Sequence, residues 1–535
     1  MAYITLFRFS SNNKPAIQST AQLVANSNAS SIEEFKNQFC GLDSVAYSNN
    51  FITEYKLPHN CEMPLGIAVD SHARKIWFVS TKQGTLGSYN LVSKKFDKEI
   101  TIPIWMARQN PNYFSDVWSV RVDMNGDVWF TDQKQNAIWK YSSSVGSLEM
   151  YKVPGTSRIF GTISPVSLDF DSKGDIYFVG THSSVLWFGN ITQLKNGTSN
   201  GVTKIPMPSS GFSGVDPNLI STGSVAVDKK KNIAWVSMLA PGPKGEILRY
   251  NITSKTFNTF ILPEQLSFPV GLAVDNNENL WVTDHGTSIF YMLNTANYNL
   301  TMFATSKASP KIYGLNDSST LPEGAYTLPY WIEKGTDDGS LWFNEHQGNK
   351  LTKFDPVTET LYEYWIPTQD RLWGDCPPSS KTCGIANVLQ FSRGENGQTW
   401  FTEWSENKIG SITQNNNNQL PFSVSASTNE LTLKRGQSVE IKVNISTTRV
   451  SSPSSPLDLN IKTVASGTFT PTGDLGNSTG FFSEQSFSLE PMRTKQVSFI
   501  FTPAIDLGLG EYTLMLGAQN DAITIMKAVK VNILD

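Results

Sequence analysis

The stretch YTLPYWIEKGTDDGSLWFNEHQGNKLTKFDPVTETLYEYWIP, residues 326–367, contains four short strand patterns separated by turn residues. An apolar run opens it at Pro329–Ile332, and further strands are predicted at Ser340–Asn344, Lys350–Phe354 and Leu361–Ile366. This order predicts a four-stranded antiparallel meander. One such sheet cannot hide both of its faces from water, so copies of it have to stack.

Copies of this unit recur along the chain, spaced by roughly 40 to 55 residues. They begin at Met63, Asp116, Ser164, Thr222, Phe268 and Gly384, which makes seven with the unit above. Four strands per repeat at this period predict a seven-bladed β-propeller. The last copy lacks a fourth strand, and FITEYKLP, residues 51–58, resembles the missing one. We therefore expect this N-terminal strand to pair with the last repeat and close the ring.

The repeat pattern ends near residue 414. A polar linker is predicted at residues 415–419, and residues 420–535 hold about seven alternating strand patterns, typical of an immunoglobulin-like β-sandwich. The predicted protein is all-β, with a lead segment at residues 1–50, the propeller at residues 51–414 and the sandwich at residues 420–535. We interpret the sandwich as a module for attachment or spacing.

Charge and hydropathy argue against a nucleic-acid surface and against a transmembrane segment. The chain has 43 Lys and Arg against 47 Asp and Glu residues, a net charge of -4, so no nucleic-acid surface is predicted. No run of 18 apolar residues occurs, so no transmembrane segment is predicted in the chain as given.

The four cysteines bear on the compartment. Cys376 and Cys383 bracket a short loop, and Cys40 and Cys61 flank the closing strand, which predicts disulfides 40–61 and 376–383. Disulfides favour an extracellular or cell-surface location. Free thiols in a reducing compartment are the alternative, and the absence of a signal-peptide pattern in residues 1–9 favours it.

Acidic residues and histidines recur at the end of the second strand of the repeat. Asp284, Glu345 and Glu403 end this strand in three successive repeats, and His285 and His346 follow two of them. Equivalent positions of neighbouring blades lie side by side, so the five are expected to form one sector. They could bind a divalent metal, Mg²⁺ or Ca²⁺, or act as general acid and base. Alternatively the carboxylates accept backbone N–H bonds and the histidines lie on a wet rim.

The innermost strand supplies a second set of candidates. One position, alanine in three repeats, holds Arg121, Asp169, Glu333 or Gln390 in the others. Ionisable groups there require partners or water, so they are predicted to pair across the channel or to line a ligand pocket. Trp118 and Tyr330 share a neighbouring position and are predicted to form an aromatic wall or simply core packing.

Two loops are unusually long for a repeat fold. They span Ser306–Leu328 and Thr368–Cys383. Loops of this length tend to be functional or to contact a partner.

The segments IWFVSTKQGTLGSYN, VWFTDQKQNAIWKY, LWFNEHQGNKLTKF and TWFTEWSENKIGSI, with closing strands TEYKLP and YEYWIP, resemble the virginiamycin B lyase (streptogramin lyase) family over residues 51–414. This resemblance implies a seven-bladed propeller, and in antibiotic-degrading members an Mg-assisted elimination that opens a cyclic depsipeptide. The family carries a His after the inner-strand Pro of the sixth blade and Glu-Pro-His in the seventh. Here the sixth blade has Tyr330 after Pro329, and the seventh has Ile385, Ala386 and Asn387, so streptogramin cleavage is not expected.

Three functions therefore follow as hypotheses. The first is an exported propeller that binds a ligand, glycan or protein partner at its channel face. The second is a metal-assisted lyase or lactonase-type enzyme that uses the acid and histidine sector. The third is a structural component of a cell envelope that assembles with envelope proteins.

Overall fold

The structure is a computed structural model that describes residues 45–103, 116–155, 161–181, 183–208, 212, 215–216, 219–240, 245–316, 319–335, 338–370, 373, 376, 383–394, 397–412, 420–448 and 458–535. In this part the protein is all-β, and helix is limited to short 3-10 turns such as η4, Pro310–Tyr313. No helix in these residues is long and apolar enough to cross a membrane.

Residues 326–367 contain a meander of four antiparallel strands, as predicted. Its strands are β22 (Pro329–Lys334), β23 (Leu341–Glu345), β24 (Lys350–Asp355) and β25 (Thr360–Trp365), hydrogen-bonded in that order. Each lies within two residues of its predicted bounds. The period of the apolar residues therefore located all four strands.

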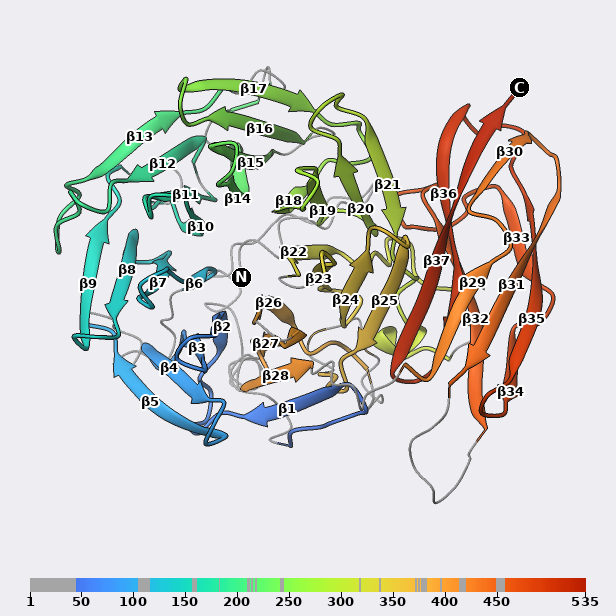
Figure 1. The fold of residues 1–535 in the computed structure, drawn as a ribbon, viewed down its shortest axis with the longest axis horizontal. Coiled ribbons are helices and arrows are strands. Elements are labelled where there is room, and N and C mark those ends of the chain that lie inside the picture. Colours follow the sequence, from blue (N-terminus) through green and yellow to red (C-terminus); the bar gives the residue numbers. More distant parts are fainter. Residues whose placement is uncertain are drawn as a thin grey trace, which may run out of the picture.

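Sheets of the same kind form a ring in Figure 1, with the first strand of each sheet nearest the axis. In chain order they are β2–β5 (Pro64–Asp70, Lys75–Ser80, Thr85–Asn90, Lys95–Thr101), β6–β9 (Val120–Val122, Val128–Asp132, Ala137–Ser142, Ser147–Lys152), β10–β13 (Pro165–Phe170, Ile176–Gly180, Val185–Gly189, Val202–Pro206), β14–β17 (Ser221–Asp228, Ile233–Leu239, Glu246–Asn251, Thr256–Ile261), β18–β21 (Pro269–Val274, Leu280–Asp284, Ile289–Leu293, Leu300–Ala304), the unit β22–β25, and β26–β28 (Val388–Arg393, Thr399–Glu403, Lys408–Ile412) with β1 (Ile52–Lys56).

Tryptophans of the second strands pack between neighbouring sheets. Trp281 on β19 lies 5.5 Å from Phe354 on β24 of the next sheet, and Trp77 on β3 lies 5.5 Å from Tyr141 on β8, measured between ring centroids. Both tryptophans are fully buried. The recurring Trp position therefore supplies the contact that joins one sheet to the next.

An asparagine closes the turn between the second and third strands in several repeats. Asn136, Asn349 and Asn407 have φ of 51°, 54° and 56°, a left-handed conformation that Asn tolerates better than most residues. The side chain of Asn349 donates to Ile366 O and Thr368 O, beyond the fourth strand. This double role explains why Asn recurs before the third strand of the repeat.

The N-terminal strand completes the last sheet of the ring. β1 pairs antiparallel with β28, with Ile52 opposite Ile412 and Lys56 opposite Lys408. Ile52 is fully buried in the core cluster that also contains Trp342 and Phe401. Chain segments about 350 residues apart are thereby joined in one sheet.

Residues 420–535 form two stacked layers beside the ring (Figure 1). One sheet has the order β29-β31-β35-β33 and the other contains β30, β37, β36, β32 and β34. Their bounds are β29 Phe422–Ala426, β30 Glu430–Lys434, β31 Val439–Thr447, β32 Leu459–Gly467, β33 Thr479–Phe482, β34 Ser486–Leu489, β35 Thr494–Thr502, β36 Gly510–Gln519 and β37 Ile523–Leu534.

The second layer is continuous with the ring. β37 pairs antiparallel with β25, from Thr360 opposite Lys527 to Tyr364 opposite Ile523. Met515 and Met526 are fully buried against ring residues such as Phe303. The sequence does not predict this pairing, because β25 belongs to a repeat of the ring whereas β37 belongs to the C-terminal layers, and the two strands lie far apart in the chain.

Candidate functional site

Two histidines meet beside the inner strands of neighbouring sheets. His285 follows β19, and its backbone N–H donates to Phe268 O (2.8 Å), just before β18. His346 follows β23, and its backbone N–H donates to Leu328 O (3.1 Å), just before β22. The two rings lie 5.6 Å apart and are inclined by only 20°. His346 is buried and His285 is half-buried. The predicted neighbourhood of these two residues is therefore present.

Both imidazoles are held neutral. Burial lowers the pKa of His285 to about 3, and the neighbouring His346 adds to this shift while the carbonyls of Leu328 and Pro329 oppose it. Burial also lowers the pKa of His346 to about 4. His346 Nε2 lies 2.6 Å from Asn387 Oδ1, so Nε2 carries the proton of the neutral ring. Nδ1 of each ring is buried and has no hydrogen-bond partner among the described residues.

Aromatic side chains complete this cluster. Tyr330, at the start of β22, lies 4.6 Å from the His285 ring and 6.1 Å from Trp118, which precedes β6 on another sheet of the ring. Trp118 is buried and Tyr330 is half-buried. We call Trp118, His285, Tyr330, His346 and Asn387 the axial cluster. It offers ring faces, two nitrogen acceptors and the Asn387 amide.

The acids that precede the histidines have other partners. Asp284 accepts the N–H groups of Phe268 (2.9 Å) and Gly286 (3.0 Å), and burial raises its pKa to about 7. Glu345 accepts from Lys350 Nζ (3.0 Å) and from the hydroxyl of Thr352 (2.5 Å). These bonds hold strands and loops together. Asp284 thus accepts backbone N–H bonds, as in the alternative given for the acids, whereas Glu345 accepts from side chains instead.

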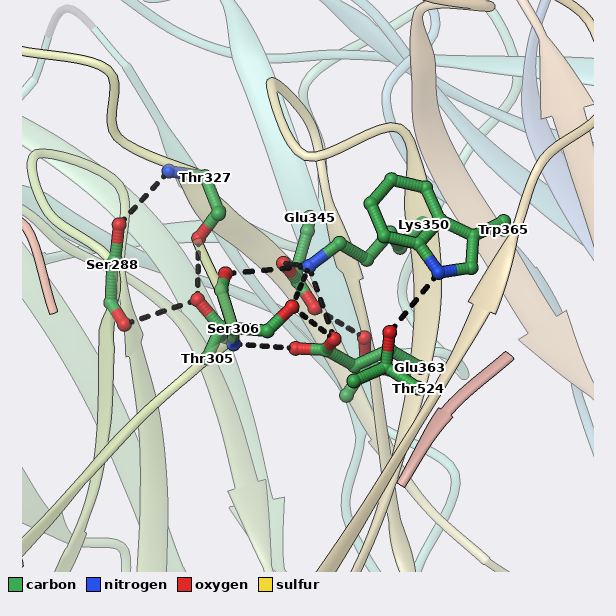
Figure 2. Close-up of polar contacts among 10 residues, drawn as sticks. Ser288, Thr305, Ser306, Thr327, Glu345, Lys350, Glu363, Trp365 and Thr524 are labelled. Carbon is green, nitrogen blue, oxygen red and sulfur yellow. Dashed lines mark hydrogen bonds and ion pairs between the residues drawn. The ribbon is translucent and has the colours of Figure 1, made fainter. Parts of the chain in front are cut away.

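Figure 2 shows the buried network around Lys350. Its Nζ lies 3.0 Å from Glu345 Oε2, 3.1 Å from Glu363 Oε2 and 2.7 Å from Ser306 Oγ. Burial and the Glu363 charge raise the pKa of Glu345 to about 8. The two carboxylates raise the pKa of Lys350, although burial opposes this. One cation is thus shared by two acids in a region without solvent.

The next sheet repeats this arrangement. Lys408 Nζ lies 3.2 Å from Glu54 Oε2 on β1, 4.0 Å from Glu403 Oε2 and 2.7 Å from Thr368 Oγ1. Burial and the Glu54 charge raise the pKa of Glu403. All three charged side chains are fully buried. In both sheets the acid that ends the second strand lies beside the lysine that begins the third strand and the glutamate of the fourth, although the Lys408–Glu403 contact is long.

The described residues do not fit Mg²⁺ or Ca²⁺ at the predicted sector. They contain no group of three or more His, Cys, Asp and Glu side chains that could hold a metal ion. The carboxylates of Asp284 and Glu345 are engaged with backbone groups, Lys350 and Thr352, while the imidazoles face the aromatic residues. No step of a mechanism is therefore derived through a metal.

The inner-strand residues make contacts both across the ring and between neighbouring sheets. Arg121 on β6 forms an ion pair with Glu333 on β22 (2.8 Å), and its guanidinium lies over Trp331. Asp169 accepts the N–H groups of Val227 (2.7 Å) and Phe170 (2.8 Å), and burial raises its pKa. Gln390 is buried, and its Nε2 has no partner among the described residues. The charges of Arg121 and Glu333 thus compensate each other.

The two long loops pack on each other beside the axial cluster. Cys376 and Cys383 form the predicted disulfide, and Cys383 Sγ and Gly384 N both lie 2.8 Å from Ile312 O of η4. Trp373 of the second loop lies 5.9 Å from Trp404. Cys61 is also disulfide-bonded, whereas Cys40 falls outside the described residues.

Sequence analysis missed the partners of the predicted residues. The sequence does not predict that Asn387 contacts His346, or that Lys350, Glu363, Lys408 and Glu54 surround the acids. The signal was present, because the W-F-x-E…N-K and E-Y patterns recur together in the last two repeats. The structure shows its meaning, because strand pairing places the Glu of the fourth strand beside the Lys of the third.

Comparison with known proteins shows which solved structures have a similar fold. No family model matches the chain, and no curated protein matches it. A streptogramin B lyase structure aligns with a TM-score of 0.50 and 19% identity, covering 68% of this chain and 98% of the lyase. The ring has the fold of a streptogramin lyase. Virginiamycin B lyase from Staphylococcus aureus aligns over the same shares, at 20% identity and a TM-score of 0.49.

A third structure extends further along this chain. The extracellular domain of a putative hybrid two-component system from B. thetaiotaomicron covers 88% of this chain and 55% of its own, with 12% identity and a TM-score of 0.44. The likeness to the streptogramin lyase fold agrees with the resemblance of the repeat motifs. At these identities it concerns the fold alone.

Proposed function

We propose that this chain is an exported seven-bladed β-propeller with an immunoglobulin-like sandwich, and that it binds a ligand at the axial cluster. The sheet order of the ring, the β1–β28 pairing and the streptogramin lyase fold support the propeller over residues 51–414. The two layers of residues 420–535 support the sandwich. The Cys376–Cys383 disulfide and the bonded Cys61 support export.

The observation that carries the binding proposal is the pair of unpartnered imidazole nitrogens. Nδ1 of His285 and Nδ1 of His346 are hydrogen-bond acceptors that no described residue satisfies, and Asn387 Nδ2 beside them is an unsatisfied donor. Buried polar groups in proteins are normally hydrogen-bonded, so each exception calls for an explanation, and a bound ligand would supply the missing partners here. A ligand with amide groups offers both the N–H donors and the carbonyl acceptor that these atoms lack.

The surroundings restrict the ligand further. Tyr330 and Trp118 supply ring faces, which favour an aromatic or apolar group on the ligand. The histidines are neutral, and Arg121 is paired with Glu333, so the cluster presents no net charge. The ligand class supported best is an uncharged amide-containing molecule with a ring, such as a peptide or depsipeptide.

Ligand-observed NMR would test this proposal. The probes are a streptogramin B, the antibiotic class named for the structure of similar fold, and N-acetyl-tyrosinamide. We expect at least one probe to show saturation transfer that is lost in a His285→Ala/His346→Ala double variant. His72→Ala is the matched control, because His72 is exposed and lies in a turn of the ring. Equal binding by both variants, or no binding of either probe, would contradict the proposal.

A catalytic role is a second candidate, favoured by one observation. Tyr330 and Asn387 stand at the positions where the streptogramin lyase family carries its histidines, and here they contact His285 and His346, which come from another repeat position. The neutral His346, held in one tautomer by Asn387, could accept a proton from a bound substrate at Nδ1. Turnover of the bound probe, followed by mass spectrometry at pH 7, distinguishes an enzyme from a binding protein.

A further inference from the structure

A strand edge is left open on the sandwich. β33 ends the sheet β29-β31-β35-β33 and pairs only with β35 among the described strands. Ser483, which follows it, donates its N–H to Ser498 O (2.8 Å). Antiparallel partners alternate between residues that exchange hydrogen bonds and residues that do not. The regular register therefore turns the N–H and C=O groups of Gly480 and Phe482 away from β35.

This edge borders a cavity of about 890 Å³ between the sandwich and the ring. The ring contributes Ser306–Pro310 and Trp365 to its walls, and all of β33 lines the other side. Phe482 and Phe499 from one sheet and Ala465 from the other also line it, so the cavity opens on the space between the two sheets. The volume lies within the range of small-ligand and peptide sites, roughly 300–1,000 Å³.

The edge also lacks the usual protection. Natural sheets guard exposed edges with charges, proline, bulges or a covering segment. β33 has the sequence TGFF, with no charge and no proline, and the Phe481 side chain is 57% exposed. By contrast, the β25 edge of the ring is covered by β37, and the β13 edge carries Lys204 and Pro206. An uncharged open edge beside a cavity is suited to the addition of a strand.

We propose that an extended segment of a partner polypeptide, with alternating apolar and polar residues, adds to β33 inside this cavity. Its backbone bonds to Gly480 and Phe482, and its apolar side chains pack towards Phe482 and Phe499. The site lies on the sandwich, so the inference goes beyond the proposed function of the axial cluster.

The charges of the cavity favour acidic residues at the polar positions of the segment. Lys307 and Lys462 line it together with a single acid, Asp474. The Asp474 carboxylate already accepts from the Thr470 hydroxyl (2.6 Å), the Thr472 hydroxyl (3.0 Å) and Gly476 N (2.9 Å). Against the effect of burial, the Lys307 charge contributes to lowering the pKa of the Asp474 carboxyl, and the lining as a whole keeps one positive charge in excess, which complements a carboxylate on the bound strand.

Fluorescence anisotropy with a defined peptide would test the inference on the full chain. The probe is fluorescein-labelled TVEVTVET, amidated at its end, compared with an isomer of the same composition in which apolar residues do not alternate with polar ones. We expect at least tenfold tighter binding of the alternating peptide. Hydrogen exchange of the Gly480 and Phe482 amides should slow when it binds, whereas a ligand that only fills the cavity would leave these amides unprotected.

Two lysine variants make the test specific. Thr479→Lys places a charge on the open edge and should weaken binding at least tenfold. Ser425→Lys is the matched control, because Ser425 is an exposed residue of β29 at the opposite edge of the same sheet. Equal effects of the two variants, no preference for the alternating peptide, or a dimer of the chain that Thr479→Lys abolishes would each overturn the inference.

Discussion

Lys350 shows how one buried cation holds three strands of a sheet. It lies between the carboxylates of Glu345 on β23 and Glu363 on β25, and all three side chains are fully buried. Removing one member of such a group leaves uncompensated charge in a medium of low polarity. The residues therefore act together, and their energetic contribution depends on all partners being present.

We expect Lys350→Met to lower the free energy of unfolding by about 3–5 kcal/mol, because two acids would lose the cation that they share. Urea denaturation of the variant and the wild type at pH 7 measures this. Lys353→Met is the control: Lys353 pairs with the more exposed Asp338, and its loss should cost about 1 kcal/mol or less. Similar losses for both variants would contradict the proposed role of the buried network.

His346 makes the fold sensitive to acid. Its pKa is about 4 in the folded protein against 6.5 for the free side chain, so the unfolded state takes up the proton first as the pH falls. The stability it contributes is complete above pH 6.5 and declines towards pH 4, by about 3 kcal/mol in all at roughly 1.4 kcal/mol per unit.

We therefore expect His346→Gln to weaken the dependence of unfolding free energy on pH between 6.5 and 4.5. Urea denaturation at both values, in the variant and the wild type, measures this difference. His72→Gln, at an exposed position, should leave the dependence unchanged. A variant that loses stability in acid as steeply as the wild type would show that His346 is not the sensor.

For single residues, the sequence indicates which side chains lie at the candidate site but not which groups they contact. The repeat alignment placed His285 and His346 in neighbouring sheets, and their rings do lie together. It could not assign Glu345 to Lys350 and Glu363, since a repeat position fixes where a side chain begins but not which group it reaches. Contact between Asn387 and His346 depends on the approach of two sheets, which no local pattern records.

Among the elements, β1 joins the two ends of the ring. Ile52 is fully buried beside Phe401 and Trp342, whereas its neighbour Thr53 is exposed. We expect Ile52→Asp to displace β1 from β28, because an unpaired carboxylate cannot remain in this core. Thr53→Asp should leave the pairing intact.

Limited proteolysis of residues 45–58 and the melting temperature would measure the displacement of β1. The Ile52→Asp variant should be cleaved faster and melt at a lower temperature than Thr53→Asp. Equal cleavage rates in the two variants would show that β1 does not depend on this packing.

Strand positions were the most predictable feature of the fold. The apolar alternation recurs in each unit, and the Trp of the second strand and the Asn before the third strand recur in several units, because every sheet meets its neighbours in the same way. The partner of β1 followed from a missing fourth strand in the last repeat. The β25–β37 pairing could not be predicted from the repeat, because β25 is the last strand of its unit and the repeat pattern contains no partner for its outer edge.

On the scale of the whole molecule, the ring and the sandwich share one core. β37 extends the β22–β25 sheet, and Met515, Met526 and Ala528 pack with ring residues. We therefore expect the two parts to unfold in a single cooperative transition. A mutation in either part should then lower the stability of both.

Tryptophan fluorescence offers a direct test of this coupling. All 14 tryptophans lie between residues 77 and 404, and of these Trp365 donates to Thr524 of β37, so the emission reports on the ring and on its contact with the sandwich. Val443→Ala, on β31 in the sandwich sheet that does not pair with the ring, should lower the fluorescence midpoint, by an amount corresponding to about 2 kcal/mol. An unchanged midpoint, with a second transition seen by calorimetry, would show that the sandwich unfolds independently.

The placement of β37 also determines how the molecule responds to mechanical load. Its first half lies between β36 and β25, and its last residues pair with β36 on one side and with β30, in parallel, on the other. A force applied at Leu534 along the strand is opposed by many backbone hydrogen bonds at once, rather than by one pair after another. Tension on the sandwich is thus transmitted through β25 into the wall of the ring, and the two parts act as one mechanical unit.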